Sequence, residues 1–143
     1  MNHQQMWDMY SRTVNTDSGY SAWSFGADPD TLAQLVLNGT KTGTSSLYLW
    51  YERGEKMPVS GEYSVVLDSR EEAVCIIRTT KVYRVPFCDV GKKHAFLEGE
   101  GDRSLSYWRK VHEQFFTEEL KEIGLPFDPR MIVVCEEFEK VFP

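Results

Sequence analysis

The sequence predicts an α+β fold with a single main domain. Two long stretches, 73–87 and 131–142, carry the apolar and β-branched residues of buried strands, and apolar residues recur at helical spacing over 104–122. Strands and helices do not alternate regularly, so a doubly wound parallel sheet is not expected. With 143 residues, 41% of them apolar, the chain can bury one sizeable core but is too short for two ordinary domains.

The N-terminal 19 residues are expected to form a helical extension, and residues 20–143 the main domain. Within the extension, residues 2–11 suit a short helix and the polar stretch 15–19 suits a loop. Aromatic residues over 20–26, YSAWSFG, then predict a short strand.

The first helix of the main domain is predicted to begin at Pro29, with Asp28 as its N-cap. Three apolar residues within it share one face. Gly39 stands where a left-handed residue commonly ends a helix, so we expect the helix to end just before Lys41.

The next segments predict short elements before the long strands. Residues 42–46, TGTSS, suit an extended stretch, and 47–55 suit a strand end followed by a short helix that stops at Gly54. Residues 63–68 alternate with the period of a strand and precede the longer strand at 73–87.

The second half of the chain contains an acidic, glycine-punctuated segment. Residues 94–104 begin as a helical turn and are expected to break into a loop. Asp102 or Ser104 then caps the longest helix, and the chain closes with the strand at 131–142.

The charge balance limits the class of ligand. The net charge is −6 and the pI is about 5.1, the wrong sign for a protein that holds long nucleic acid by counterion release. Any contact with RNA must therefore be local, and the ligand is expected to be compact.

The composition also bears on location and metals. No stretch approaches the roughly 20 apolar residues of a membrane helix, and the first residues lack the pattern of a secretory signal, so a cytoplasmic protein without a membrane partner is expected. Cys75, Cys88 and Cys135 show no CxxC spacing, and the three histidines are scattered. No disulfide framework, zinc cluster or catalytic transition metal is predicted, and the first and last of these cysteines are expected in the core.

Several motifs in order carry a resemblance to a known family. They are WSFG at 23–26, LVLNGTKTGTSS at 35–46, YERGEKMPVSGEYSVVLD at 51–68, PFCDV at 86–90, EGEGDRSLSYWRKVH at 98–112 and MIVVCEEFEKV at 131–141. Together they resemble the longer bacterial type of the ASCH domain family, in the PUA-like superfamily. This resemblance implies a PUA-like mixed β-barrel with flanking helices, and a cleft that binds RNA or a modified nucleoside.

The resemblance directs attention to Lys41 and Thr44, which match the GxKxxT element of the family. A lysine serves as a base only if its surroundings depress its pKa, and otherwise binds a phosphate or carbonyl oxygen. A neutral lysine beside Thr44 would activate its hydroxyl for attack on an amide. The alternative is a solvated lysine beside hydroxyl residues of a strand edge.

The acidic segment supplies the carboxylates. The resemblance makes Glu98 or Glu100 the glutamate that completes the lysine and threonine pair. Three carboxylates spaced by glycines, with Asp102 as the third, would also accept hydrogen bonds from a nucleobase or hold Mg²⁺. The alternative is a solvated acidic turn in which Asp102 only caps the following helix.

Other residues are expected to bind substrate. Arg109 and His112 lie about one helical turn apart, so they can face the same side and reach a phosphate or leaving group, although such residues commonly decorate a helix surface. Trp23 and Tyr51 are among aromatics able to stack on a base, most of which belong in the core. Ser45 and Asp102 complete the predicted substrate-binding set.

Three functions remain open at this stage. The first is hydrolysis of a nucleoside amide such as that of N4-acetylcytidine, without a cofactor. The second is a single-strand ribonuclease, which would need Mg²⁺ or Mn²⁺. The third is a non-catalytic module that recognises RNA or a nucleotide. For all three functions, the chain is expected to be a monomer or a homodimer.

Overall fold

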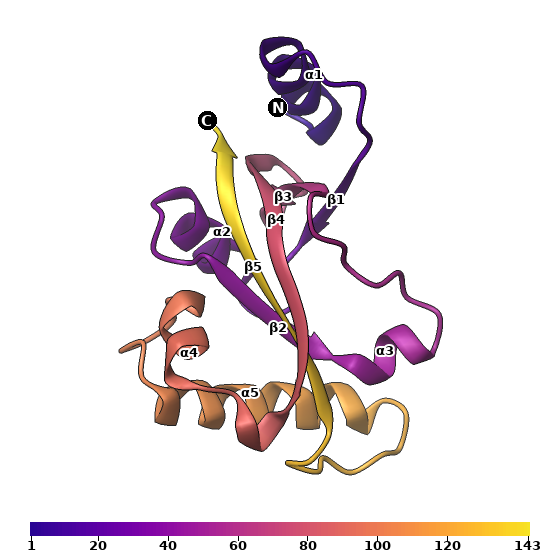
Figure 1. The fold of residues 1–143 in the computed structure, drawn as a ribbon, viewed down its shortest axis with the longest axis vertical. Helices are drawn as coiled ribbons and strands as arrows, with labels where there is room; N and C mark the ends of the chain where they lie inside the picture. Colours follow the sequence, from indigo (N-terminus) through magenta and orange to yellow (C-terminus); the bar gives the residue numbers. More distant parts are fainter.

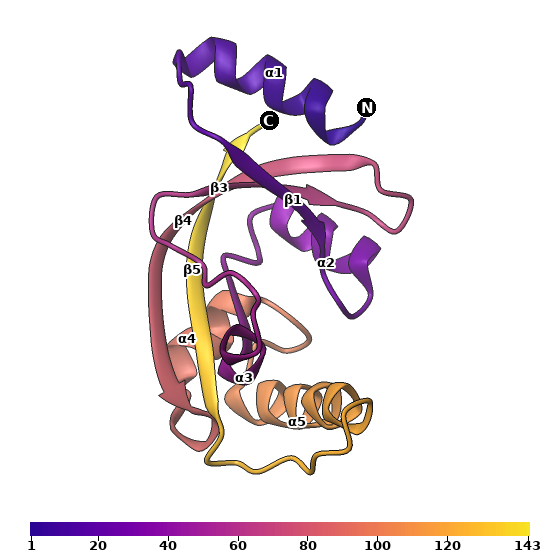
Figure 2. The same ribbon diagram turned by 90° about the vertical axis from the view of Figure 1, so that its right-hand side faces the viewer.

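The computed structural model describes residues 1–143 and contains one five-stranded sheet that curls into a half-barrel (Figures 1 and 2). The strand order is β1-β3-β4-β5-β2, with β1 parallel to β3 and all other pairs antiparallel. The strands are β1 (Tyr20–Ser24), β2 (Gly43–Leu47), β3 (Tyr63–Leu67), β4 (Ala73–Pro86) and β5 (Ile132–Phe142). The predicted fold of a mixed, barrel-like sheet with flanking helices is confirmed.

The curl of the sheet comes from its two long central strands. β4 and β5 pair from Ile76 to Pro86, with register shifts between Ile76 and Ile77 and between Thr79 and Lys81. Such irregularities bend a strand and increase its twist. β1 and β2 are the two edge strands of this curled sheet.

Helices cover the sheet at several places (Figure 2). They are α1 (His3–Val14), α2 (Pro29–Leu37), α3 (Tyr48–Glu52), the 3₁₀ turn η1 (Phe87–Asp89), α4 (Lys92–Glu98) and α5 (Leu105–Lys121). The helix N-caps agree with those expected from the sequence. The Asp28 side chain accepts a hydrogen bond from Thr31 N at the start of α2, and the Ser104 side chain accepts one from Tyr107 N at the start of α5. No helix combines the length and hydrophobicity needed to cross a membrane.

Three apolar clusters fill the structure. One lies between α5 and the sheet and includes Phe116 and Leu120, and a second lies under α2. The third packs Met6, Trp7 and Tyr10 of α1 against strands β3 and β4. Cys75 and Cys135 are buried as predicted, and all three cysteines are free. The division into an extension and a main domain stays a prediction, although α1 shares the third cluster with the sheet.

The structure differs from expectation around the acidic segment. The sequence predicts that residues 94–104 begin as a helical turn and then form a loop with Glu98, but α4 begins at Lys92 and Glu98 is its last residue. Glu98 therefore does not belong to the loop, and its side chain is buried. Packing of His94 and Ala95 against the sheet stabilises this short helix, which has no side-chain N-cap.

Candidate functional site

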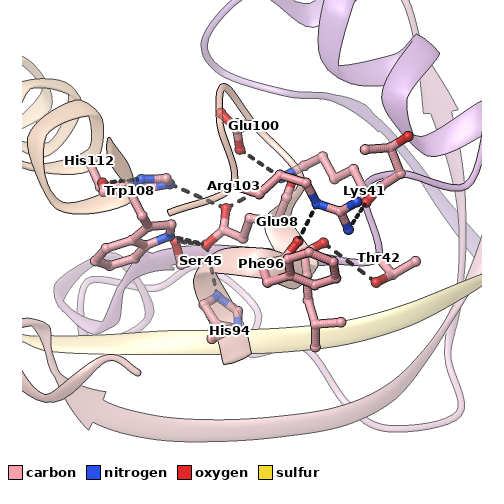
Figure 3. A network of polar contacts seen from close by, with 12 residues as sticks. Lys41, Thr42, Ser45, His94, Phe96, Glu98, Glu100, Arg103, Trp108 and His112 are labelled. Atoms are coloured by element: carbon pink, nitrogen blue, oxygen red, sulfur yellow. Dashed lines mark hydrogen bonds and ion pairs between the residues drawn. The ribbon is translucent and has the colours of Figure 1, made fainter. Parts of the chain in front are cut away.

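The site begins at the turn that follows α2. Gly39 has φ +85°, and the backbone N–H of Lys41 donates to the carbonyl of Leu35, so the chain reverses and aims the Lys41 side chain inward. That side chain is only 1% exposed. Its Nζ lies 3.0 Å from Glu100 Oε2, 3.3 Å from Glu98 Oε1 and 3.4 Å from the Glu98 carbonyl oxygen (Figure 3).

Backbone contacts hold the lysine turn against the end of α4. Thr42 N donates to the carbonyl of Leu97 at 2.7 Å. Gly99 has φ +72°, and a side chain there would collide with the carbonyl of Thr40, so only glycine permits this close approach. Arg103 donates to the carbonyls of Thr40 and Phe96 at 3.3 and 3.1 Å. The two segments are thus joined on both sides of the ion pairs.

Glu98 is the centre of the polar network (Figure 3). Its Oε2 lies 2.7 Å from Ser45 Oγ, 2.8 Å from His94 Nε2 and 2.6 Å from Trp108 Nε1. Its Oε1 lies 3.3 Å from both Lys41 Nζ and His112 Nε2. Five donors surround a carboxylate that is 1% exposed, so its accepting capacity is filled.

The network shifts two protonation equilibria. Burial by itself raises the pKa of the Glu98 carboxyl, but Lys41 and His112 outweigh it and hold that pKa well below its usual range. Burial lowers the pKa of His112, yet the negative charge of Glu98 outweighs it and the net shift is upward. Glu98 is therefore a fixed anion, and His112 a favoured cation beside it.

The histidine geometry agrees with this charge pattern. His112 Nδ1 lies 2.9 Å from the carbonyl of Trp108 and Nε2 faces Glu98, so both ring nitrogens donate. His94 differs, because its Nε2 faces Glu98 while its buried Nδ1 has no hydrogen-bond partner. This pattern assigns the proton of a neutral His94 to Nε2.

A small pocket of about 80 Å³ lies beside this network. Its polar lining comes from Lys41, Thr44, Ser45, Glu98, Glu100 and His112. Its apolar lining comes from Phe25, Ala27, Leu32, Val111 and Phe115, together with the backbone of Gly26. The pocket therefore combines charged groups from α4 and its loop with aromatic rings from the segment after β1 and from α5.

The rim of the pocket carries groups with unused hydrogen-bonding capacity. The Glu100 side chain is 18% exposed, and only its Oε2 is bonded, to Lys41. The hydroxyl of Thr44 makes no hydrogen bond within the protein, although Thr44 lines the pocket. A ligand can therefore bond Glu100 Oε1 and the Thr44 hydroxyl without breaking an existing contact.

Four residues of the predicted set lie outside this pocket. Trp23 packs edge-on against Phe25 within the cluster under α2, and the Tyr51 hydroxyl lies 2.7 Å from Ser46 Oγ. Asp102 is exposed and accepts from Ser104 N, while Arg109 donates to the carbonyl of Cys88 at 3.2 Å. Of the pair Arg109 and His112, only His112 lines the pocket, and the role of every predicted site residue stays a prediction.

Three residues of the site could in principle act as ligands of a divalent cation. Ligand atoms of Glu98, Glu100 and His112 lie within 4.8 Å of one another. However, Glu98 already accepts five donors, Glu100 pairs with the Lys41 ammonium, and both nitrogens of His112 donate. A metal ion would have to displace the ammonium and remove a proton from the imidazole, so these residues do not fit Mg²⁺ or Mn²⁺.

Sequence reasoning missed two members of the network, His94 and Trp108. Each stands four residues before another network residue, His94 before Glu98 on α4 and Trp108 before His112 on α5. This spacing places both members of a pair on the same helix face, and the Trp108 and His112 rings stack at 4.3 Å. The two pairs at helical spacing were the signal that could have identified them.

A curled mixed sheet with flanking helices is the architecture of the PUA-like class. Comparison with known families gives the narrower assignment, because the ASCH domain family matches residues 21–142. The chain therefore belongs to the ASCH domain family. No curated protein matches it.

Solved structures agree with this assignment. An ASCH domain from Lactobacillus crispatus JV V101 is 34% identical, with a TM-score of 0.92 over 98% of this chain and 94% of that one. A protein from Enterococcus faecalis V583 is 35% identical, with a TM-score of 0.88 over 99% and 93% of the two chains. A hypothetical protein with 18% identity has a TM-score of 0.58 over 86% of this chain and all of its own, which bears on the fold alone.

Proposed function

We propose that the pocket binds the base of a nucleoside unit and hydrolyses an amide attached to it, as in N4-acetylcytidine. One observation carries this proposal. Two carboxylates hold the buried side chain of Lys41 beside the pocket. The same small pocket is lined by Thr44 and Glu100, whose hydroxyl and Oε1 make no hydrogen bond within the protein. A donor, a nucleophile and a proton acceptor are the parts that amide hydrolysis requires.

The lining suits a planar polar ring. Phe25 and Phe115 offer aromatic surface, while Glu100 offers an acceptor for an exocyclic N–H of the base. Lys41 and His112 place positive charge beside the pocket, which favours a carbonyl oxygen of the ligand there. The pocket volume of about 80 Å³ suits an acyl group and one edge of a base.

The charges assign a role to each residue. Because Lys41 donates to two carboxylates, it acts as a cation that polarises the amide carbonyl rather than as a base. Glu100, through its free Oε1, accepts the proton of the Thr44 hydroxyl as Thr44 Oγ bonds to the carbonyl carbon. The same proton passes to the leaving nitrogen as its bond to carbon breaks, and water then hydrolyses the acyl-threonine ester.

Glu98 is a positioning residue in this mechanism. Its low pKa makes it a weak proton acceptor, and its contacts fix Lys41, Ser45 and His112. The glutamate implied by the family resemblance is therefore assigned to Glu100 for proton transfer and to Glu98 for orientation.

The test is to incubate purified protein with N4-acetylcytidine and to follow cytidine and acetate by chromatography. Wild type is expected to release both without added metal. Glu100→Gln should lower kcat by about 10²- to 10⁴-fold, the usual contribution of a positioned proton acceptor. Thr44→Val should abolish turnover, whereas Thr44→Ser, the matched control, should keep it because a hydroxyl remains.

Two other results would redirect the proposal. Binding of cytidine that depends on Lys41, without turnover, would favour a non-catalytic nucleotide-binding module. Cleavage of single-stranded RNA that requires Mg²⁺ or Mn²⁺ would favour a ribonuclease, against the poor fit of the donor set to a cation.

A further inference from the structure

A second, larger hollow of about 610 Å³ adjoins the loop that carries Glu100. Its lining comes from Lys92, Lys93 and Phe96 of α4, from Arg103, and from the first residues of α5, Ser104–Ser106. We call this surface the basic groove. It contains no carboxylate, histidine or cysteine, so acid-base chemistry in it is not expected.

The charge of the groove is opposite to that of the whole protein. Three cationic side chains and no acidic one line it, whereas the net charge of the chain is −6. An anion approaching the protein is therefore attracted locally to this groove. Three cations suit one or two phosphates rather than a long nucleic-acid track.

Arg103 is held in place for such a contact. Its Nε and Nη2 donate to the carbonyls of Phe96 and Thr40, and its guanidinium carbon lies 3.6 Å from the centre of the Phe96 ring. Its Nη1 makes no hydrogen bond within the protein, so donors remain for a phosphate oxygen. Phe96 is 52% exposed and offers surface for stacking a base.

The start of α5 adds to the attraction for an anion. This helix has 17 residues, and the backbone N–H groups of Leu105 and Ser106 in its first turn have no intrahelical acceptor. They lie at the positive end of the helix dipole and within the lining of the groove. Their contribution supplements that of the three cationic side chains.

The small volume of the pocket indicates that part of a bound nucleotide lies outside it, toward the basic groove. Ligand pockets commonly measure roughly 300 Å³ or more. A pocket of about 80 Å³ is too small for a whole nucleotide, so the ribose and the phosphates of a bound nucleotide must lie outside it. Arg103 donates to Thr40, the residue before Lys41, so a groove cation adjoins the pocket.

We propose that the basic groove binds a phosphodiester next to the nucleotide whose base enters the pocket, and that the ligand is a short single-stranded RNA rather than a free nucleoside. This inference rests on the proposed function, because it assumes that the pocket holds the base. It adds a binding surface with its own residues, Lys92, Lys93, Phe96 and Arg103.

The test compares two unmodified probes, cytidine and a fluorescent cytidine trinucleotide, which contain no amide to hydrolyse. Binding is measured from 50 to 200 mM salt for wild type, for Lys92→Ala/Lys93→Ala, and for the control Lys56→Ala/Lys121→Ala, which removes two exposed lysines outside the groove. The double groove variant should bind the trinucleotide about tenfold more weakly. Its logarithmic salt slope should fall by about 1.4, or about 0.7 for each lost phosphate contact.

The outcomes separate this inference from the proposed function. Cytidine binding should be unchanged in both double variants, and Phe96→Ala should weaken only the trinucleotide. Equal trinucleotide binding by wild type and the groove variant, or an equal loss in the control, would overturn the inference and leave nucleoside hydrolysis standing. Absence of cytidine binding to wild type, with trinucleotide binding lost in the groove variant alone, would overturn the assigned pocket and retain the groove as an RNA surface.

Discussion

The inner wall of the pocket and its rim differ in how completely their polar groups are bonded. On the inner wall, Glu98 accepts five donors and is 1% exposed. On the rim lies Glu100, two residues after Glu98 in the sequence. Only one of its carboxylate oxygens is hydrogen-bonded, its side chain is 18% exposed, and the Thr44 hydroxyl makes no hydrogen bond within the protein. The two glutamates of the same segment thus differ, because both oxygens of Glu98 are bonded within the protein whereas one oxygen of Glu100 is not.

The largest expected effect is on the inner wall. Glu98→Gln removes the buried counter-charge of His112 and one of the two carboxylates paired with Lys41, and should lower the free energy of unfolding by about 3 to 5 kcal/mol. Urea denaturation at neutral pH measures this loss. Glu100→Gln is the matched control and should change stability by less than about 1 kcal/mol. Equal losses in the two variants would remove the distinction between wall and rim.

The next effect concerns the contact that holds the wall together. Gly99→Ala introduces a Cβ against the Thr40 carbonyl at a residue with φ +72°, and should destabilise the protein by about 3 kcal/mol. Gly124 has a similar φ, +71°, but a Cβ there would meet no atom within 4 Å, so Gly124→Ala should cost only about 1 kcal/mol. Thermal unfolding of both variants checks the difference, and equal melting temperatures would contradict it.

A third glutamate, Glu136, extends the comparison of wall and rim because no hydrogen-bond donor reaches its carboxylate. Glu136, half-buried on β5 opposite Thr44, accepts no hydrogen bond within the protein, and burial raises its pKa to about 7, with Glu62 adding to the rise. The folded state thus favours protonated Glu136. Its stabilisation is fully present below the unfolded pKa, near 4.5, and is lost as the pH rises through about 7.

Replacing this residue tests the sign of that shift. Glu136→Gln should match wild type near pH 4.5 and exceed its stability by about 2 kcal/mol at pH 8, because the buried negative charge is absent. Urea denaturation across this pH range measures the difference. Glu139→Gln, at an exposed position of the same strand, is the matched control for removing one carboxylate from β5. A profile of Glu136→Gln parallel to that of wild type would contradict the assignment.

The smallest effect is expected at Arg103. Arg103→Lys keeps the positive charge but loses the fork that reaches two carbonyls and stacks on Phe96, so it should destabilise by about 1 kcal/mol. Chemical denaturation reports this change. The control Arg109→Lys alters a single exposed contact to Cys88 and should have no measurable effect.

Local sequence patterns predicted most of the fold. The caps at Asp28 and Ser104 and the apolar periodicity located α2 and α5, and the β-branched runs located β4 and β5. The sequence did not predict the burial of Glu98, because burial depends on donors from β2, α4 and α5 that meet only after packing. For the same reason it did not separate Trp23, Tyr51 and Arg109 from the pocket, since their side-chain directions depend on tertiary contacts.

The docking of α4 on β2 has a consequence for how occupancy can be observed. Lys41 and Glu98 are 57 positions apart along the chain, so the pocket exists only while these two elements remain joined. The Thr42 amide donates to the carbonyl of Leu97 across that junction, so its proton should exchange when the junction opens. A molecule that enters only the closed form should slow deuterium uptake at Thr42 as its concentration rises, which gives a ligand screen that requires no turnover.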